Sequence, residues 1–401
     1  MRVVLVHNRY RSIAPSGETT VVEREGRALT DLGHEVIWFE RSSDEIEHWS
    51  KAKKAALPAR TIWSREAHRD LTATLREHRP DVVHVHNTFP LLSPSILYAC
   101  RDARVPVVAS IHNKRLMCAN GAFFRNGAVC HDCAEGSALQ GVLHGCYRGS
   151  RAASASVVLA TSVHRRSWRS LVSAFVFASA SQRDLLSGLG LPTDRVFVKS
   201  HVIPRKEMRK VERGSNVMYA GRLEEAKGVR VLMAGWDSYR RRSGESGLRL
   251  VIAGGGELQN EVAAWASTRP SVDLVGRVDD DRFTELMSSA RAILLPSTCE
   301  ETFGLVVVEA MAAGSPPIAA AHGALAELIT PGVDGMLFKP SDPEALGLAI
   351  ADVEAHPERY EIYGAQARET YEKQFDPDRI MEQLLEIYRF AITHPVFRLA
   401  V

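Results

Sequence analysis

The chain has 401 residues, of which 45% are hydrophobic and 24% charged, and it carries a net charge of +2. This length is enough for two domains with complete cores, and the composition is that of a globular protein. The near-neutral charge argues against a nucleic-acid-binding protein, because such domains are clearly basic. The first residues, MRVVLVHNRY, hold too short an apolar run for a secretory signal, and no run of 18 uncharged apolar residues offers a membrane span. We therefore expect a cytoplasmic protein.

Strand-like segments alternate with helix-length segments along the whole chain. The first half contains RVVLVH, HEVIWFE, DVVHVH, VPVVASIH, AFVFAS and RVFVKSHVIP, and the second contains VMYAGRL, LRLVIAGGG, SVDLVGRV, RAILLPS, SPPIAAA and GMLFKP. This alternation is typical of βαβ units around a parallel sheet. The charged segment RKEMRKVERGSN separates the two series. We predict an α/β protein of two doubly wound domains, residues 1–204 and 205–375, joined near residues 204–215.

Residues 376–401 are predicted to form a closing helix and tail. Asp376 suits the N-cap and Pro377 the first helical position. The apolar side chains of the helix form a single stripe, which consists of Ile380, Met381, Leu384, Leu385 and Tyr388.

Two motifs bring phosphate-binding features to strand ends of the second domain. GRLEEAKG places Arg222 and Lys227 after the first strand, where a guanidinium fork and an ammonium group suit phosphate oxygens. IAGGGE places Gly254, Gly255 and Gly256 after the next strand, where missing side chains let backbone approach a ligand. A lone triple glycine is also common in ordinary strand-to-helix turns.

The third motif, EETFGLVVVEAMAAG, carries two acids. Glu301 lies in the loop after a buried strand that ends at Pro296, and residues 303–313 are predicted to form a helix closed by Gly314. Open α/β sheets bind ligands at that edge, and the first free amides of the helix offer an anion site. Glu309 follows two turns into the helix. Either acid alone has an ordinary explanation, a loop position or a side chain that reaches solvent, but their spacing favours a site.

Together these motifs resemble the donor-binding half of the retaining glycosyltransferases of family 4. The resemblance covers nearly the whole chain, and its most specific element is the pair Glu301 and Glu309 with seven residues between them. It implies the GT-B fold, with two facing Rossmann-like domains, the acceptor on the first, a nucleotide sugar on the second, and a C-terminal helix packing back toward the first. It also implies a glycosyltransferase of the hexosyltransferase type.

The resemblance implies a role for each motif. Glu309 would hydrogen-bond the ribose hydroxyls, and Glu301 would hold hydroxyls of the transferred sugar. Arg222 and Lys227 would hold the diphosphate and stabilise the leaving nucleotide. The other residues that would bind the donor, in part through backbone groups, are Gly254, Gly255, Arg277, Phe303, Gly304 and Leu305.

The family mechanism is a front-face transfer in which the leaving phosphate helps take the acceptor's proton, so no protein nucleophile is expected. The cleft segments hold no Asp-any-Asp pair, and the acids near Asp279 are typical of a helix cap. We therefore expect no catalytic metal. The donor nucleotide is left open among UDP, GDP and ADP. The acceptor is left open among a saccharide, a lipid-linked group and a small molecule, with products in polysaccharide, glycolipid or glycosylated-metabolite biosynthesis.

The first domain offers three further candidates. Gly17, in SGETT, resembles the family's glycine loop near the donor phosphates, although Ser16 replaces the first of the two glycines often found there. His86 and His112 end neighbouring strands. A histidine at such a position is more often a structural hydrogen-bonding group, but the resemblance makes His112 a sugar-contacting residue of the active site. The role of His86 is left open.

Four of the six cysteines lie in an insertion near residues 114–150: Cys118, Cys130, Cys133 and Cys146. Zinc binds four thiolates at spacings of this kind, and a metal would order an insertion that lacks an apolar stripe. Such a closed site would be structural. Four reduced thiols, or a reactive CxxC pair, remain the alternatives.

Two segments, HWSKAKKAALPARTIW and HRRSWRSL, combine cations with Trp. This composition is found on faces that touch anionic membranes, although solvated basic faces are commoner. Peripheral contact with the cytoplasmic face of a membrane therefore stays open. So do two other functions, a nucleotide-sugar epimerase or phosphorolytic enzyme of the same fold and a zinc-stabilised module that binds nucleic acid.

Overall fold

The computed structural model describes residues 1–12, 16–205, 213–244 and 247–398. These residues divide into two compact units. The first comprises Met1–Phe123, Cys130–Val202 and Asp378–Val401, and the second comprises Phe124–Val129 and Ile203–Pro377. Part of the predicted junction, residues 206–212, lies outside the described residues.

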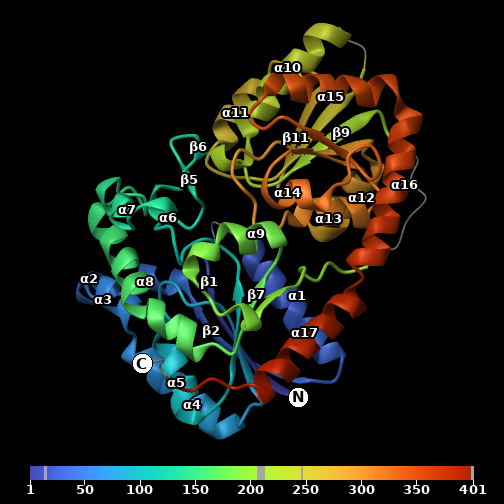
Figure 1. Cartoon of the computed structure of the whole chain (residues 1–401). Helices are drawn as coiled ribbons and strands as arrows, with labels where there is room; N and C mark the ends of the chain where they lie inside the picture. Colours follow the sequence, from blue (N-terminus) through green and yellow to red (C-terminus); the bar gives the residue numbers. More distant parts are fainter. Residues whose placement is uncertain (13–15, 206–212, 245–246, 399–401) are drawn as a thin grey trace. The chain divides into compact units, whose positions relative to one another are not determined.

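The first unit is built on a six-stranded sheet in which every neighbouring pair is parallel. The strand order is β2-β1-β3-β4-β7-β8, and Figure 1 labels β1, β2 and β7. The bounds are β1 (Arg2–Arg9), β2 (Glu35–Ser42), β3 (Val82–Asn87), β4 (Val107–Ile111), β7 (Ala174–Phe177) and β8 (Val196–Val198). All six strands coincide with predicted strand segments.

Each face of this sheet is covered by its own helices. Val4 and Val6 of β1 belong to a core shared with α4 (Arg65–His78), α5 (Ser95–Ala103) and α8 (Arg151–Leu171). Val3 and Leu5 point to the opposite face, since successive strand side chains alternate. There they share a core with α1 (Gly17–Asp31) and α17 (Pro377–Thr393) (Figure 1). The predicted stripe of α17 is buried in this second core, so the closing helix packs on the first unit.

Shorter elements complete this unit. They are η1 (Ser43–His48), α2 (Lys51–Ala55), α3 (Leu57–Ile62), α6 (Asp132–Glu135), α7 (Leu139–Leu143), α9 (Ala180–Leu185), η2 (Ser187–Leu189) and η3 (Thr193–Arg195). Within the cysteine-containing insertion, Phe124–Val129 belong to the second unit and form a two-stranded antiparallel hairpin, β5 (Phe124–Arg125) and β6 (Ala128–Val129).

The second unit repeats the design with the strand order β11-β10-β9-β12-β13-β14, again all parallel. Its strands are β9 (Asn216–Ala220), β10 (Arg249–Ala253), β11 (Val272–Gly276), β12 (Ala292–Leu295), β13 (Pro317–Ala320) and β14 (Met336–Phe338). Its helices are η4 (Glu225–Lys227), α10 (Val229–Ser243), α11 (Gln259–Ala266), α12 (Asp280–Ser289), α13 (Leu305–Ala312), α14 (Gly323–Leu328), α15 (Pro343–Ala355) and α16 (Pro357–Gln374). Asp279 caps α12, as predicted.

Candidate functional site

The sheet of the second unit has a topological switch point between β9 and β12. The chain runs outward from β9 to β11 in one direction and from β12 to β14 in the other. Ligands of open parallel sheets bind beyond the carboxyl ends of the strands at this point. The loop after β9 carries Lys227, and the loop after β12 carries Glu301. The sheet topology therefore brings together two predicted site residues that lie far apart in the sequence.

Lys227 and Glu301 form an ion pair at this edge. The Lys227 Nζ lies 2.6 Å and 2.9 Å from the two carboxylate oxygens, and the Ser297 hydroxyl donates to Glu301 Oε1 at 2.7 Å. Burial lowers the pKa of Lys227, but Glu301 more than offsets this, and the pKa lies above its usual value. Because both side chains keep part of their surface exposed, the pair presents an ammonium group and carboxylate oxygens to solvent.

The loop that carries Lys227 is clamped to the end of β12. Gly228 adopts a left-handed backbone with φ of 68°, and a Cβ there would lie 1.7 Å from the Pro296 carbonyl oxygen. The amides of Thr298 and Cys299 donate to the Ala226 carbonyl at 3.1 and 3.2 Å. Only glycine fits this crossing, and the crossing aims Lys227 at Glu301.

Two of the predicted glycines have a structural reason of their own. A Cβ at Gly254 would lie 1.9 Å from the Gly221 carbonyl oxygen, and one at Gly256 would lie 2.5 Å from the Leu223 carbonyl oxygen. The missing side chains therefore let loops of the same unit pack closely, and the contact with a ligand stays a prediction. Gly255 instead lies beside the exposed Arg277 at the end of β11.

Arg222 and Phe303 differ from expectation in their surroundings. The Arg222 guanidinium is half exposed and donates to Glu224 at 2.7 Å. The Phe303 side chain is buried and packs edge-on against Phe375. Its ring is therefore part of the core, and only its backbone can contribute to a donor site.

The helix after Glu301 starts two residues later than predicted. It begins at Leu305 because Gly304, at φ of 92°, forms a left-handed N-cap, and a Cβ at Gly304 would clash with Leu325. Its first amides stay at the switch point, where they can bind an anion. Glu309 is buried within the helix, 8% exposed.

In the first unit, strand alternation gathers polar groups on the face covered by α1 and α17. Residues two positions apart in a strand point to the same face. In β3, His84 and His86 therefore share the face of Val82, and in β1 His7 shares that of Leu5. Ser110 of β4 and His112, just after it, share the face of Val108. They are joined from outside the sheet by a Glu and a Lys: Glu25 of α1 and Lys199, which follows β8.

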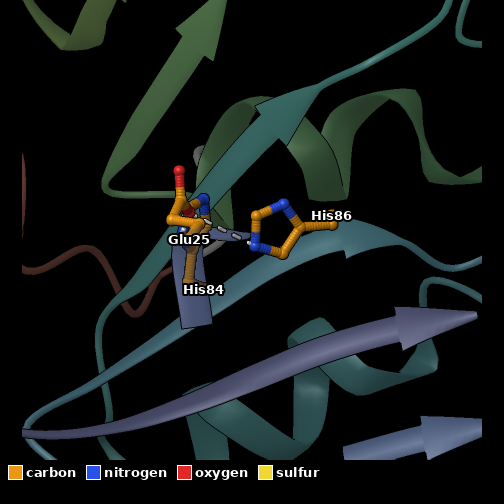
Figure 2. Close-up of side chains that lie close together, drawn as sticks. All are labelled: Glu25, His84 and His86. Carbon is orange, nitrogen blue, oxygen red and sulfur yellow. Dashed lines mark ion pairs between the residues drawn. The ribbon is translucent and has the colours of Figure 1, made fainter. Parts of the chain in front are cut away.

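Glu25 is the centre of this cluster and lies beside His84 and His86 (Figure 2). Its side chain is almost fully buried. Its Oε2 accepts from Lys199 Nζ at 2.7 Å, and its Oε1 lies 3.1 Å from His84 Nδ1 and 3.6 Å from His86 Nε2. Burial opposes the charge, but Lys199 and His84 hold the pKa of Glu25 well below its usual value. His86 and His112 are neutral, because burial holds the pKa of each well below its usual value.

A second buried carboxyl, Glu18, lies in the first turn of α1 directly after Gly17. The Tyr10 hydroxyl donates to its Oε2 at 3.2 Å and the Asn113 amide at 3.4 Å. Burial raises the pKa of Glu18 to about 7, while these two hydrogen bonds act in the opposite direction. Glu18 therefore titrates near neutral pH, a property common in groups that act at functional sites.

His112 lines a pocket of the first unit that opens beyond β3 and β4. The wall combines polar groups with an apolar side, and it includes His86, Phe89, His112, Asn113, Arg115 and Trp168. Arg115 also lies over the Phe89 ring at 4.4 Å. Because Asn113 lines the pocket and also binds Glu18, the titrating carboxyl is coupled to the pocket wall.

Sequence comparisons identify the family. One family model, described as Glycosyltransferase Family 4, matches residues 15–205, and another, Glycosyl transferases group 1, matches residues 204–370. The chain is a family 4 glycosyltransferase. Family membership and the two parallel-sheet units confirm the prediction of a GT-B fold, and they decide against the epimerase and the nucleic-acid-binding module.

Individual relatives agree with this family. The chain is 27% identical to a glycogen synthase of Mycobacterium tuberculosis, over 97% of this chain and 94% of that protein. It is 29% identical to an uncharacterized glycosyltransferase of Methanocaldococcus jannaschii, but there the match spans only 44% of this chain and 45% of the relative. The crystal structure of Anabaena HepE in complex with UDP superposes with a TM-score of 0.67 at 16% identity and covers 96% of this chain and 99% of its own.

The four cysteines of this glycosyltransferase are near one another but not at ligand distance. Burial raises the pKa of Cys133, and the thiols of Cys118, Cys146 and Cys130 raise it further. Among the described residues, the group of three or more potential metal ligands whose atoms lie within 4.8 Å of one another is Glu25, His84 and His86. The cysteine sulfurs are therefore more widely spaced than a tetrahedral zinc requires.

The two Trp-containing basic segments are partly built into the fold. Trp168 is buried in the core of the first unit. Trp63 stacks on His164 at 6.1 Å and Trp49 lies under Lys53 and Arg60. Within the described ranges of the chain, no helix has both the length and the apolar character needed to cross a membrane.

The sequence reasoning missed Glu25, Lys199 and Glu18. Glu25 had a readable signal, because it lies in the inward stripe of α1 with Val21, Val22 and Leu29. A carboxylate in such a stripe is buried and needs a partner. The partner, Lys199, is 174 residues away, so no local pattern could name it.

Proposed function

We propose that this glycosyltransferase moves a sugar from a nucleotide diphosphate sugar to an acceptor hydroxyl with retention of the anomeric configuration. The observation that supports this best is the Lys227–Glu301 ion pair at the switch point of the second sheet. A charged ammonium group is held there at the same edge of the sheet as the loop that leads into α13, in a place suited to a diphosphate. The fold neighbour HepE, which was crystallised with UDP, agrees with a nucleotide diphosphate ligand.

In this proposal each group acts on the part of the donor that its chemistry suits. Lys227, with Arg222 nearby, stabilises the negative charge that develops on the leaving diphosphate. Glu301 accepts hydrogen bonds from hydroxyls of the transferred sugar, and Glu309 from the ribose. Side chains of the first unit, above all His112, contact the sugar or the acceptor. The acceptor is a saccharide, a lipid-linked group or a small molecule. Positive charge at the diphosphate comes from the protein, so we propose transfer without a catalytic metal.

The proposal is tested with the nucleotides themselves. Saturating UDP, GDP, ADP and dTDP are compared for their effect on the thermal midpoint, each with and without EDTA, because a ligand that binds only the folded state raises stability. We expect a rise with one nucleotide, unchanged by EDTA. The corresponding nucleotide sugar then serves as substrate, and NMR of the anomeric proton reports whether configuration is retained. No rise with any nucleotide, or an inverted product, contradicts the proposal.

We also propose a structural zinc on Cys118, Cys130, Cys133 and Cys146, supported by the four thiols within one insertion. The wide spacing of the sulfurs means that they would have to move closer to bind it. Protein purified without chelator is expected to hold about one zinc per chain. Less than half an equivalent would favour reduced thiols.

We place the enzyme in the cytoplasm, with peripheral membrane contact through the segment around Trp49 and Trp63. The cations of this segment, among them Lys53 and Arg60, support the contact. Co-sedimentation with anionic vesicles at low salt tests it, and neutral vesicles are the control. Failure to sediment with anionic vesicles contradicts the membrane contact.

A further inference from the structure

A continuous line of polar groups connects Lys199 with His112 inside the first unit. Lys199 pairs with Glu25 at 2.7 Å, Glu25 Oε1 lies 3.6 Å from His86 Nε2, and His86 Nδ1 lies 2.9 Å from His112 Nε2. The His112 ring is stacked between His86 and His201, with ring centroids 5.2 and 5.3 Å away. The ring plane and one nitrogen of His112 are thus set by neighbours, and His112 lines the pocket beyond β4.

Glu25, His84 and His86 also have the composition of a metal site. Lys199 argues against that function, because its ammonium group already neutralises the buried carboxylate. A divalent cation would add two further charges beside a buried ammonium in a medium of low dielectric constant. The cluster is better explained by what the carboxylate does to the histidines.

The proton positions follow from the partners. His86 Nε2 faces the Glu25 carboxylate at 3.6 Å, beyond hydrogen-bond distance, and the negative charge there favours a proton on Nε2 over a lone pair. In a neutral imidazole the other nitrogen, Nδ1, is then an acceptor. Its partner at 2.9 Å, His112 Nε2, must therefore donate. Nδ1 of His112 is left as an acceptor, and among the described residues it has no hydrogen-bond partner.

We propose that Glu25 and His86 are positioning residues that hold His112 as the Nε2–H tautomer, so that its Nδ1 accepts a hydrogen bond from a hydroxyl of the sugar bound in the pocket. The inference rests on the proposed function, since it concerns the same sugar-transfer site. A flipped ring or the other tautomer would present an N–H to the sugar and would leave the sugar hydroxyl without an acceptor.

The experiment compares two substitutions of nearly equal size at one position. In His86→Gln, the amide nitrogen can donate to Glu25 and the amide oxygen can accept from His112, whereas His86→Met offers neither. NMR of ¹⁵N-histidine-labelled protein identifies the protonated nitrogen of His112, and loss of its signals in His112→Asn assigns them. We expect Nε2 to be protonated in the wild type and in His86→Gln, and a mixture of tautomers in His86→Met.

Kinetics provide the second readout. We expect His86→Met to lower kcat by about tenfold, the value of one lost hydrogen bond, with KM for the donor little changed. His86→Gln should recover most of that loss. A wild type with Nδ1 protonated, or equal kcat for the Gln and Met variants, overturns the proposal. The NMR result does not need turnover, so it separates failure of this inference from failure of the proposed sugar transfer.

Discussion

The carboxyl-end polar groups of the two sheets are stabilised in different ways. In the second unit, Lys227 and Glu301 lie in loops, keep part of their surface exposed, and are oriented by a backbone crossing at Gly228. In the first unit, Glu25 and Lys199 are buried within the layer under α1 and α17 and neutralise each other there. Removing a loop residue should therefore change ligand chemistry, whereas removing a core charge should change folding.

The largest expected effect is on stability, at Glu25. Glu25→Gln leaves Lys199 buried without its countercharge and should lower the free energy of unfolding by about 3–5 kcal/mol. Urea unfolding at pH 7 measures this, and Glu77→Gln, at a side chain 76% exposed, is the control. The pKa of Glu25 is lower in the folded state than in the unfolded state. The stabilisation of the wild type by the Glu25 carboxylate is therefore complete at neutral pH, and it is lost as pH falls below the pKa of the unfolded state. A loss under 1 kcal/mol would mean that the carboxylate is not the partner that Lys199 needs.

The second effect should appear in turnover and not in folding. Lys227→Ala removes the ammonium group that stabilises the negative charge on the leaving diphosphate, and should lower kcat by about 10²–10³-fold. The matched control is Lys339→Ala, at an ammonium group 79% exposed in the same unit. Steady-state kinetics and circular dichroism are measured on both. Equal turnover in the two variants would show that the ion pair at the switch point has no part in the chemistry.

The third effect concerns pH and separates the two buried acids of α1. The folded pKa of Glu18 is about 7, above its unfolded value, so the folded state holds this proton more tightly. The stabilisation of the folded state by this proton is complete at low pH and is lost as pH rises to about 7. The loss lowers the free energy of unfolding by up to about 3 kcal/mol. Glu18→Gln should therefore stabilise the protein at pH 8 and change little near pH 5. Parallel pH profiles for variant and wild type would contradict the raised pKa.

The smallest effect should be on nucleotide binding. Glu309→Gln weakens one charged hydrogen bond and should raise the Kd for the nucleotide by about tenfold. Calorimetric titration measures the change, with Glu358→Gln, in the first turn of α16, as the control. An unchanged Kd would assign Glu309 to the core of the second unit and not to the ribose.

Much of the site was readable from local sequence. The twelve strands followed from apolar runs bounded by turns, and they placed Arg222, Lys227, Gly255 and Glu301 at strand ends. The sequence could not show which neighbours surround these residues. Gly254 and Gly256 meet the backbone of another loop, and the Phe303 ring packs into the core. No pattern within the motifs distinguishes these uses from ligand contact.

The sequence by itself determined the two parallel sheets, the stripe of α17 and the residues at the strand ends, because these depend on periodicities of two and 3.6 residues. Tertiary structure alone decided which of those residues meet. Lys227 reaches Glu301 across 74 positions and Lys199 reaches Glu25 across 174. Sheet order brings such residues together, and the energy of a charge depends on the partner and burial that this order provides.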